Sequence, residues 1–246
     1  MLRAALLACG LLLVPAGSLP SAAPATAPST PADSGLSEAA LWLRDYLRID
    51  TTNPPGGERQ SAAFLASILH RAGIPTRTFF TPEGRASLYA RLPATVAGQG
   101  SATSLVLLHH MDVVAPGPGW TVDPFGGTVA EGRLWGRGAV DAKSLGIAHL
   151  AALIDLQRSR TPRHRDVVFL AVADEESGGA QGTGWLLDHH PELFEDVAAV
   201  LNEGGANLVL RGNLQWWGIE VAQKRPLWLE VTATAGGTSR TGRVSS

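Results

Sequence analysis

The chain has 246 residues, of which 45% are hydrophobic and 17% charged, and this balance predicts a globular protein with a sizeable core. A formal net charge of −2 argues against nucleic acid or an acidic membrane surface as the main partner. The single cysteine, Cys9, lies near the N-terminus, so disulfides and thiolate metal ligands are excluded from the rest of the chain.

The first 23 residues have the layout of a secretory signal peptide. One arginine precedes an apolar run over 4–14, and small residues lead up to Ala23, where cleavage is expected. The run is too short to cross a bilayer, so we expect no integral membrane span. A secreted or periplasmic protein is predicted, and a lipoprotein is less favoured because Cys9 comes too early. Residues 24–35, rich in Pro, Ala and Ser, are predicted to be a flexible linker.

Helical and extended patterns alternate along the rest of the chain. Apolar residues at helical spacing predict helices at Ser37–Ile49, Arg59–Gly73, Ser144–Gln157 and Gly182–His190. Shorter extended stretches are predicted at Thr76–Phe80 and Ser87–Leu92. Continuous apolar runs predict buried strands at Ser104–His110, Asp166–Ala173 and Val197–Asn202. The alternation predicts an α/β fold, with a layered, mostly parallel sheet flanked by helices.

Polar residues follow each of the three buried strands. They are, in chain order, His110 and Asp112, then Asp174, Glu175 and Glu176, then Glu203. Because binding sites in such sheets lie at the carboxyl ends of the strands, these side chains are expected to converge. One histidine with several carboxylates suits Zn²⁺ or a similar divalent cation. A cation would also offset the repulsion among consecutive acids, and two cations sharing a carboxylate and a nucleophilic water would do so better.

Four segments resemble, in order, the signature motifs of the co-catalytic zinc exopeptidase and deacylase family. They read "HMDVV", "WGRGAVDAK", "ADEESGG" and "LNEGG". That family includes carboxypeptidase S, aminoacylase, acetylornithine deacetylase and succinyl-diaminopimelate desuccinylase, and the similarity runs from about Leu36 to Ala235. It implies a hydrolase that cleaves amide bonds of peptides or N-acyl amino acids with metal-activated water. The family uses two Zn²⁺ ions, for which Co²⁺ can substitute.

The resemblance also implies ligands for the first metal. His110 and Glu203 would bind it, and Asp112 would hold the other imidazole nitrogen of His110. Asp141, in Gly-x-x-Asp-x-Lys, would bridge both metals. In related enzymes the peptide bond after this aspartate is often cis, so we expect a cis bond between Asp141 and Ala142.

The paired glutamates complete the implied site. Glu176 would bind the second metal. Glu175 would be the general base, which takes a proton from the attacking water and passes it to the leaving amine.

The sequence departs from the family pattern in its C-terminal part. Family members continue into a lid domain that contributes a histidine, and the return to the catalytic domain supplies the last ligand of the second metal. Here "PLWLEVTATAGG" resembles the first strand of the lid, whereas "TSRTGRVSS" resembles nothing in the family. We therefore expect a partial catalytic domain at 36–224, followed at 225–246 by the start of the lid and an aberrant tail. We also expect the sheet to be incomplete, with an unpaired edge, and the chain to bind one metal ion better than two.

Two functions remain open at this point. The leading hypothesis is the N-terminal catalytic part of a secreted zinc-dependent exopeptidase or N-acyl-amino-acid hydrolase. The alternative is a catalytically inactive remnant that binds metal or peptide without turnover. A serine hydrolase is not supported, because the chain has no Gly-x-Ser-x-Gly motif. The sequence indicates neither the exact substrate nor an oligomer.

Three further groups of residues have structural interpretations. His109 is expected to point away from the site, and His189 and His190 are expected to cap the C-terminus of a helix. Trp216 and Trp217 are expected to pack within a strand.

Overall fold

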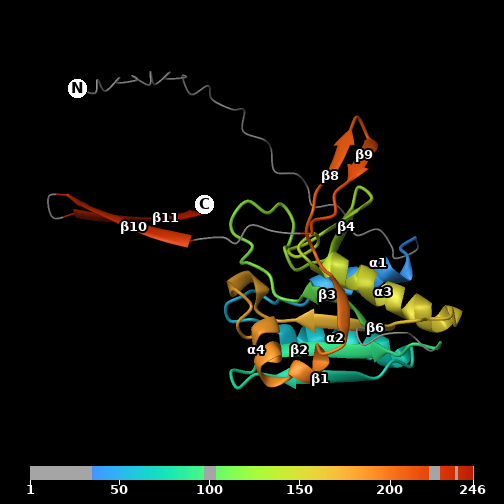
Figure 1. Ribbon diagram of the computed structural model, residues 1–246. Coiled ribbons are helices and arrows are strands. Elements are labelled where there is room, and N and C mark those ends of the chain that lie inside the picture. Colours follow the sequence, from blue (N-terminus) through green and yellow to red (C-terminus); the bar gives the residue numbers. More distant parts are fainter. Residues whose placement is uncertain (1–34, 97–103, 222–227, 236–237, 246) are drawn as a thin grey trace, which may run out of the picture.

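The structure, a computed structural model, describes residues 35–96, 104–221, 228–235 and 238–245 (Figure 1). The helices are α1 (Glu38–Leu47), α2 (Glu58–Arg71), α3 (Lys143–Ser159) and α4 (Thr183–His189), with 3₁₀ turns η1 (Glu175–Ser177) and η2 (Pro191–Leu193). The first strands in chain order are β1 (Thr76–Phe80), β2 (Ala86–Leu92), β3 (Ser104–His110), β4 (Thr128–Ala130), β5 (Arg133–Trp135), β6 (Asp166–Val172) and β7 (Val197–Leu201). They are followed by β8 (Asn207–Leu210), β9 (Asn213–Trp217), β10 (Trp228–Ala235) and β11 (Thr238–Ser245).

A five-stranded sheet in the order β1-β2-β6-β3-β7 forms the centre of the domain (Figure 1). Strands β6, β3 and β7 run parallel, whereas β2 and β1 are added antiparallel at one side. The predicted α/β fold with a mostly parallel sheet is therefore confirmed. The parallel register, in which His110 lies beside Val172, brings the carboxyl ends of β3 and β6 to the same edge.

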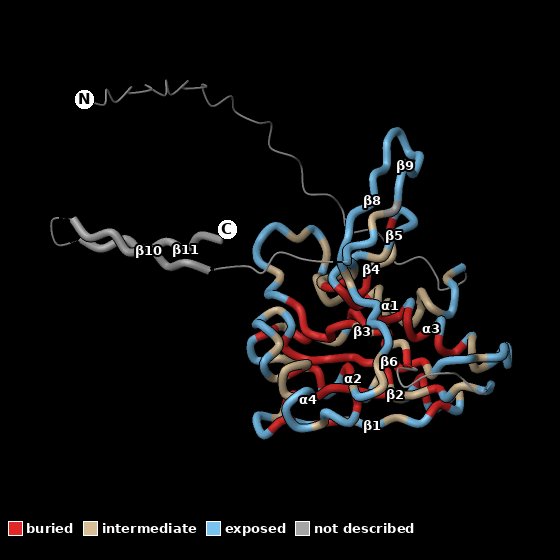
Figure 2. The backbone as a smooth tube through the Cα atoms, viewed as in Figure 1, coloured by how far each residue is buried: buried red, intermediate tan, exposed pale blue. Residues whose placement is uncertain are grey.

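Helices cover both faces of this sheet. Side chains from α1, α2 and α3 pack on one face in a core that includes Leu65, Leu107, Leu150 and Phe169. Helix α4 and η2 pack on the other face, where Leu186 meets residues that alternate with those of the first face. Much of β3 and β6 is buried between these two layers (Figure 2), and each buried leucine or phenylalanine contributes about 1.5–3 kcal/mol to the stability of the fold.

Most of the predicted elements are confirmed, with small shifts at their ends. The first helix begins after Ser37, whose side chain accepts a hydrogen bond from the amide of Ala40 at 3.2 Å. The second helix ends just before Gly73, which has a positive φ of 75° and so stops the helix as predicted. In the described residues no helix is both long and apolar enough to cross a membrane. The predicted signal peptide and most of the predicted linker lie outside the described residues.

The prediction of a buried third strand is wrong for β7. Val200 and Leu201 are 55% and 50% exposed, and the strand pairs with β3 on one side. No other strand of the described ranges pairs with its second side. The expected unpaired edge is thus present in the described part of the sheet. The burial of β7 was predicted wrongly because an apolar run indicates that a strand forms but not how many neighbouring strands it has.

Three two-stranded hairpins lie outside the five-stranded sheet, and the sequence patterns did not predict them as hairpins. They are β4–β5, β8–β9 and β10–β11, each antiparallel. The last pairs the strand expected to open the lid, Trp228–Ala235, with Thr238–Ser245 from the segment expected to be an aberrant tail. The domain boundary expected at 224/225 stays a prediction.

Candidate metal centre

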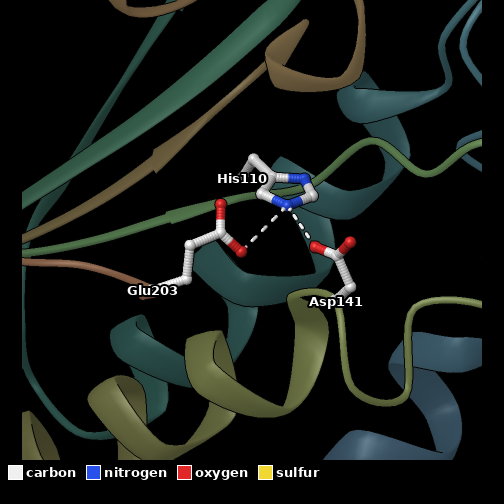
Figure 3. A group of neighbouring side chains, drawn as sticks. All are labelled: His110, Asp141 and Glu203. Atoms are coloured by element: carbon white, nitrogen blue, oxygen red, sulfur yellow. Dashed lines mark hydrogen bonds and ion pairs between the residues drawn. The ribbon is translucent and has the colours of Figure 1, made fainter. Parts of the chain in front are cut away.

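Three of the predicted ligands meet at the carboxyl edge of the sheet. His110 is the last residue of β3, Asp141 lies just before α3, and Glu203 follows β7 (Figure 3). The Nε2 atom of His110 lies 2.9 Å from Oδ1 of Asp141 and 3.5 Å from Oε2 of Glu203. One ligand atom from each residue lies within 4.8 Å of the other two. One imidazole nitrogen and two carboxylate oxygens at this spacing are a donor set that fits Zn²⁺.

The imidazole of His110 is oriented by the main chain of Asp112. Its Nδ1–H donates to the carbonyl oxygen of Asp112 at 2.9 Å, which leaves Nε2 facing the two carboxylates. The Oδ1 atom of Asp112 lies 3.6 Å from the same Nδ1. The carbonyl group of Asp112 therefore contacts this nitrogen more closely than its side chain does.

Electrostatics at His110 favour a positive charge. Burial alone would lower the pKa of His110, but the carboxylates of Asp112, Glu203 and Asp141 outweigh it and raise this pKa to about 11. The hydrogen bond to His110 in turn lowers the pKa of Glu203. In the metal-free protein a proton on Nε2 thus takes the place that a cation would fill.

Glu175 lies beside this group without being part of it. Its Oε2 is 4.0 Å from Nε2 of His110, and the side chain is half exposed. Partial burial raises the pKa of Glu175; His110 opposes this, whereas Glu203 and Asp112 add to it. A carboxylate with a raised pKa next to candidate metal ligands is suited to accept and return a proton.

Glu176 is half-buried in η1, and its position as a ligand of a second metal stays a prediction. Partial burial and the charge of Asp141 raise the pKa of Glu176. It does not belong to the group of three ligands found among the described residues.

Asp174, the first of the three consecutive acids, does not join the metal group. It is 6% exposed, and its Oδ1 lies 3.1 Å from Nη1 of Arg85 and 3.2 Å from Nδ2 of Asn53. Its Oδ2 accepts a hydrogen bond from the amide of Gln181 at 2.9 Å. The protein itself therefore neutralises one of the three acids, through partners that no local pattern identified.

Asp112 extends this polar network to the pair of glutamates. Its carboxylate accepts hydrogen bonds from Nδ2 of Asn53 at 2.8 Å and from the amides of Glu175 and Glu176, both at 3.1 Å. Burial would raise the pKa of Asp112, but the nearby imidazole of His110 and the hydrogen bond from Asn53 outweigh this and lower it. Asp112 is thus a charged acceptor that holds both the histidine and the η1 turn.

Lys143, two residues after Asp141, is hydrogen-bonded to the main chain at the C-terminal end of α1. Its side chain is fully buried, and Nζ donates to the carbonyl oxygens of Tyr46 at 3.2 Å and Ile49 at 2.7 Å. Burial lowers the pKa of Lys143 to about 7. The expected cis peptide bond between Asp141 and Ala142 is present.

A cavity of about 720 Å³ opens beside the cluster. Glu175 and Glu203 line it on the polar side, and the apolar side chains of Leu201, Ile219 and Val221 line it elsewhere. The cavity therefore places apolar surface next to the carboxylates.

The structural interpretations of the other residues are confirmed in part. His109 is fully buried against Phe169, and Nδ1 of His189 contacts the carbonyl oxygen of Trp185 at 2.9 Å, as expected of a helix cap. His190 instead contacts Glu192. The prediction that Trp216 packs within a strand is wrong, because this side chain is 48% exposed on β9. The side chain of Trp217 lies outside the described part.

Comparison with known proteins agrees with this fold. Residues 106–216 match the model of Peptidase family M20/M25/M40. The chain is 33% identical over 189 residues to a succinyl-diaminopimelate desuccinylase of Gluconobacter oxydans. This alignment covers 68% of the present chain and 47% of the desuccinylase. The matched segment therefore belongs to this peptidase family, and the chain spans about half the length of that relative.

Two solved structures share the fold. One is an M20 family metallo-carboxypeptidase, Sso-CP2, from Sulfolobus solfataricus, with a TM-score of 0.58 and 23% identity over 80% of this chain and 41% of that chain. The other is human carnosine dipeptidase 1, with a TM-score of 0.54 and 20% identity over 67% of this chain and 38% of that chain. At these identities the likeness shows the α/β fold alone.

Proposed function

We propose that the protein is a metal-dependent hydrolase that cleaves amide bonds of peptides or N-acyl amino acids. The observation that carries this proposal is the convergence of His110, Asp141 and Glu203, with the carboxylate of Glu175 4.0 Å from the imidazole. Its similarity to a desuccinylase supports the same class of reaction. The N-terminal sequence supports a secreted or periplasmic location.

His110, Asp141 and Glu203 would hold the metal, because they offer one nitrogen and two oxygen ligands at compatible distances. We propose Zn²⁺, with Co²⁺ as a substitute, since this mixed donor set lacks the six or more oxygens that Ca²⁺ prefers. When bound, such a cation polarises a carbonyl group and lowers the pKa of water.

Glu175 is the proposed general base. Its raised pKa makes the carboxylate a better proton acceptor than an exposed glutamate, and its half-exposed position leaves it open to the adjoining cavity. It accepts the proton of the water that attacks the amide carbonyl and returns it to the nitrogen that leaves. The hydrogen bonds from the Glu175 and Glu176 amides to Asp112 keep this segment in place during both transfers.

A second candidate function is metal or peptide binding without turnover. It is favoured by one observation: among the described residues, one group of three potential metal ligands is found, His110, Asp141 and Glu203, and Glu176 is not part of it. One three-ligand site is enough to bind a cation but lacks the paired arrangement that the family resemblance implies.

Hydrolysis assays on the purified chain separate the two candidates. N-succinyl and N-acetyl amino acids and dipeptides serve as substrates, with Zn²⁺ or Co²⁺ added. We expect metal-dependent turnover, which Glu175→Gln lowers by about 10²–10⁴ because the base is lost. Glu83→Gln, a change of an exposed glutamate in the turn before β2, is the matched control. Metal binding without turnover would support the second candidate, and turnover that survives Glu175→Gln would contradict the assigned base.

A further inference from the structure

Two arginines at opposite ends of β2 each pair with two carboxylates. Arg85, just before the strand, pairs with Glu58 and Asp174. Arg91, near its other end, pairs with Asp166 and Asp196. Because β2 runs antiparallel to β6, Arg85 lies at the metal-site edge of the sheet and Arg91 at the far edge. The chain thus contains one buried arginine cluster next to the site and a second, more exposed one away from it.

The cluster of Arg85 connects directly to the turn that carries the two glutamates. Nη1 of Arg85 donates to Oδ1 of Asp174 at 3.1 Å and to Oδ1 of Asn53 at 3.3 Å. The amide group of Asn53 donates in turn to both Asp174 and Asp112. The carboxylate of Asp112 then accepts hydrogen bonds from the main-chain amides of Glu175 and Glu176, at the start of η1. Two hydrogen-bonded routes therefore lead from one guanidinium group to η1.

Burial makes this guanidinium difficult to replace. Arg85 is 8% exposed and Glu58 is 1% exposed, so little water is available to solvate the carboxylates in its absence. Asp174 also has a positive φ of 69°, which is uncommon for residues other than glycine although aspartate adopts it more readily than most. The forked hydrogen bonds of arginine, which contact Glu58 and Asp174 together, fix the side chain of Asp174 in this conformation.

We propose that Arg85 is a positioning residue that fixes η1, and with it the carboxylates of Glu175 and Glu176, beside the metal ligands. It acts through Asp174 and Asn53 and does not touch the reacting atoms. The catalytic meaning of this position rests on the proposed function, but the position of the turn can be measured without any turnover.

Hydrogen–deuterium exchange of the full chain tests the proposal directly. The amides of Glu175, Glu176 and Gln181 donate to side chains of the network, so their exchange reports on it. In Arg85→Met we expect these amides to exchange at least about tenfold faster than in the unmodified chain, beyond any change in global stability. Arg85→Lys, which keeps the charge without the fork, should restore part of the protection.

Arg91→Met is the matched control, because it removes a paired arginine from the same strand at the far edge. We expect it to leave exchange at 175–181 within about threefold of the unmodified chain while loosening amides near Asp166 and Asp196. Equal acceleration at 175–181 in both arginine variants, or none in Arg85→Met, would overturn the proposal. Should Arg85→Met not fold, Asp174→Asn must release the amides of Gln181 and Glu175, and unchanged protection there would also overturn it.

Cobalt binding and turnover complete the test. We expect Arg85→Met to bind Co²⁺ within about threefold of the unmodified chain, since His110, Asp141 and Glu203 lie outside the network's direct contacts with Arg85. A loss of cobalt affinity as large as the gain in exchange would overturn the assignment to η1. If the unmodified chain is active, we expect Arg85→Met to lower kcat and to leave KM unchanged. Absent turnover in the unmodified chain would refute the proposed function and leave the exchange result standing.

Discussion

Metal binding at His110 should release one proton over an unusually wide pH range. The pKa of His110 is about 11 in the metal-free protein, because nearby carboxylates outweigh the effect of burial. The imidazole therefore carries a proton at neutral pH, and a metal that binds Nε2 must displace it. Affinity then rises with pH, by about tenfold or 1.4 kcal/mol for each unit, as long as the pH stays below this pKa.

The size of the window distinguishes this account from that of an ordinary histidine. A histidine with the usual pKa of about 6.5 would stop releasing a proton above about pH 7.5. For this chain we expect a slope near one in the logarithm of the affinity for Co²⁺ between about pH 6 and 9. Glu203→Gln removes a carboxylate that raises the pKa of His110, so its slope should flatten at a lower pH.

Calorimetric titrations with Co²⁺ measure this release. At each pH the titration is repeated in two buffers that differ in ionisation enthalpy, and the difference gives the number of protons released. About one proton per bound ion at pH 8.5 supports the electrostatic description of the site. A value near zero at that pH, with the metal still bound through His110, would refute it.

Three other predictions concern stability. At about 100 times its dissociation constant, Zn²⁺ should stabilise the fold by about 2.7 kcal/mol and raise the melting midpoint by roughly 5–10 °C, and Asp141→Asn should remove most of that rise. Burial lowers the pKa of His149, so the unfolded chain takes up a proton below about pH 6.5 that the folded chain does not. Urea unfolding should therefore show stability falling from pH 7 to pH 5, and falling less in His149→Leu. A methyl group at Gly146 would overlap the ring of His109, so Gly146→Ala should destabilise the fold by about 1–2 kcal/mol despite its better helix propensity; an unchanged urea midpoint would contradict this.

Local patterns predicted the elements that position the site. The run ending at His110 and the run ending at Val172 are continuous, and the strands have the predicted bounds to within one residue. Because parallel strands end at one edge, the residues after them converge, as Glu203 does with His110. The cis bond after Asp141 followed from family resemblance and not from any pattern of its own.

The network behind the site could not be predicted in this way. Arg85 and Asp174 are far apart in the sequence, and neither residue type nor spacing indicates that they pair. The exposure of β7 was missed for a related reason, since it depends on which strands lie beside it. Tertiary contacts of this kind are set by the whole fold.

The small hairpins did leave a local signal. Glu131–Gly132 joins β4 to β5, and Arg211–Gly212 joins β8 to β9, each as a two-residue connection. All four residues have positive φ values, which is typical of the tight hairpin turns that favour glycine at the second position. Such a dipeptide between short apolar stretches could have identified both hairpins.

We propose that His110, Asp141 and Glu203 hold a catalytic metal. This proposal is tested most directly by anomalous diffraction from crystals of the zinc-loaded chain, collected on both sides of the zinc absorption edge. We expect one strong peak about 2.0–2.2 Å from Nε2 of His110 and from a carboxylate oxygen of Asp141 and of Glu203. A peak that lies elsewhere, or a fully loaded ion that makes no contact with His110, would contradict the account.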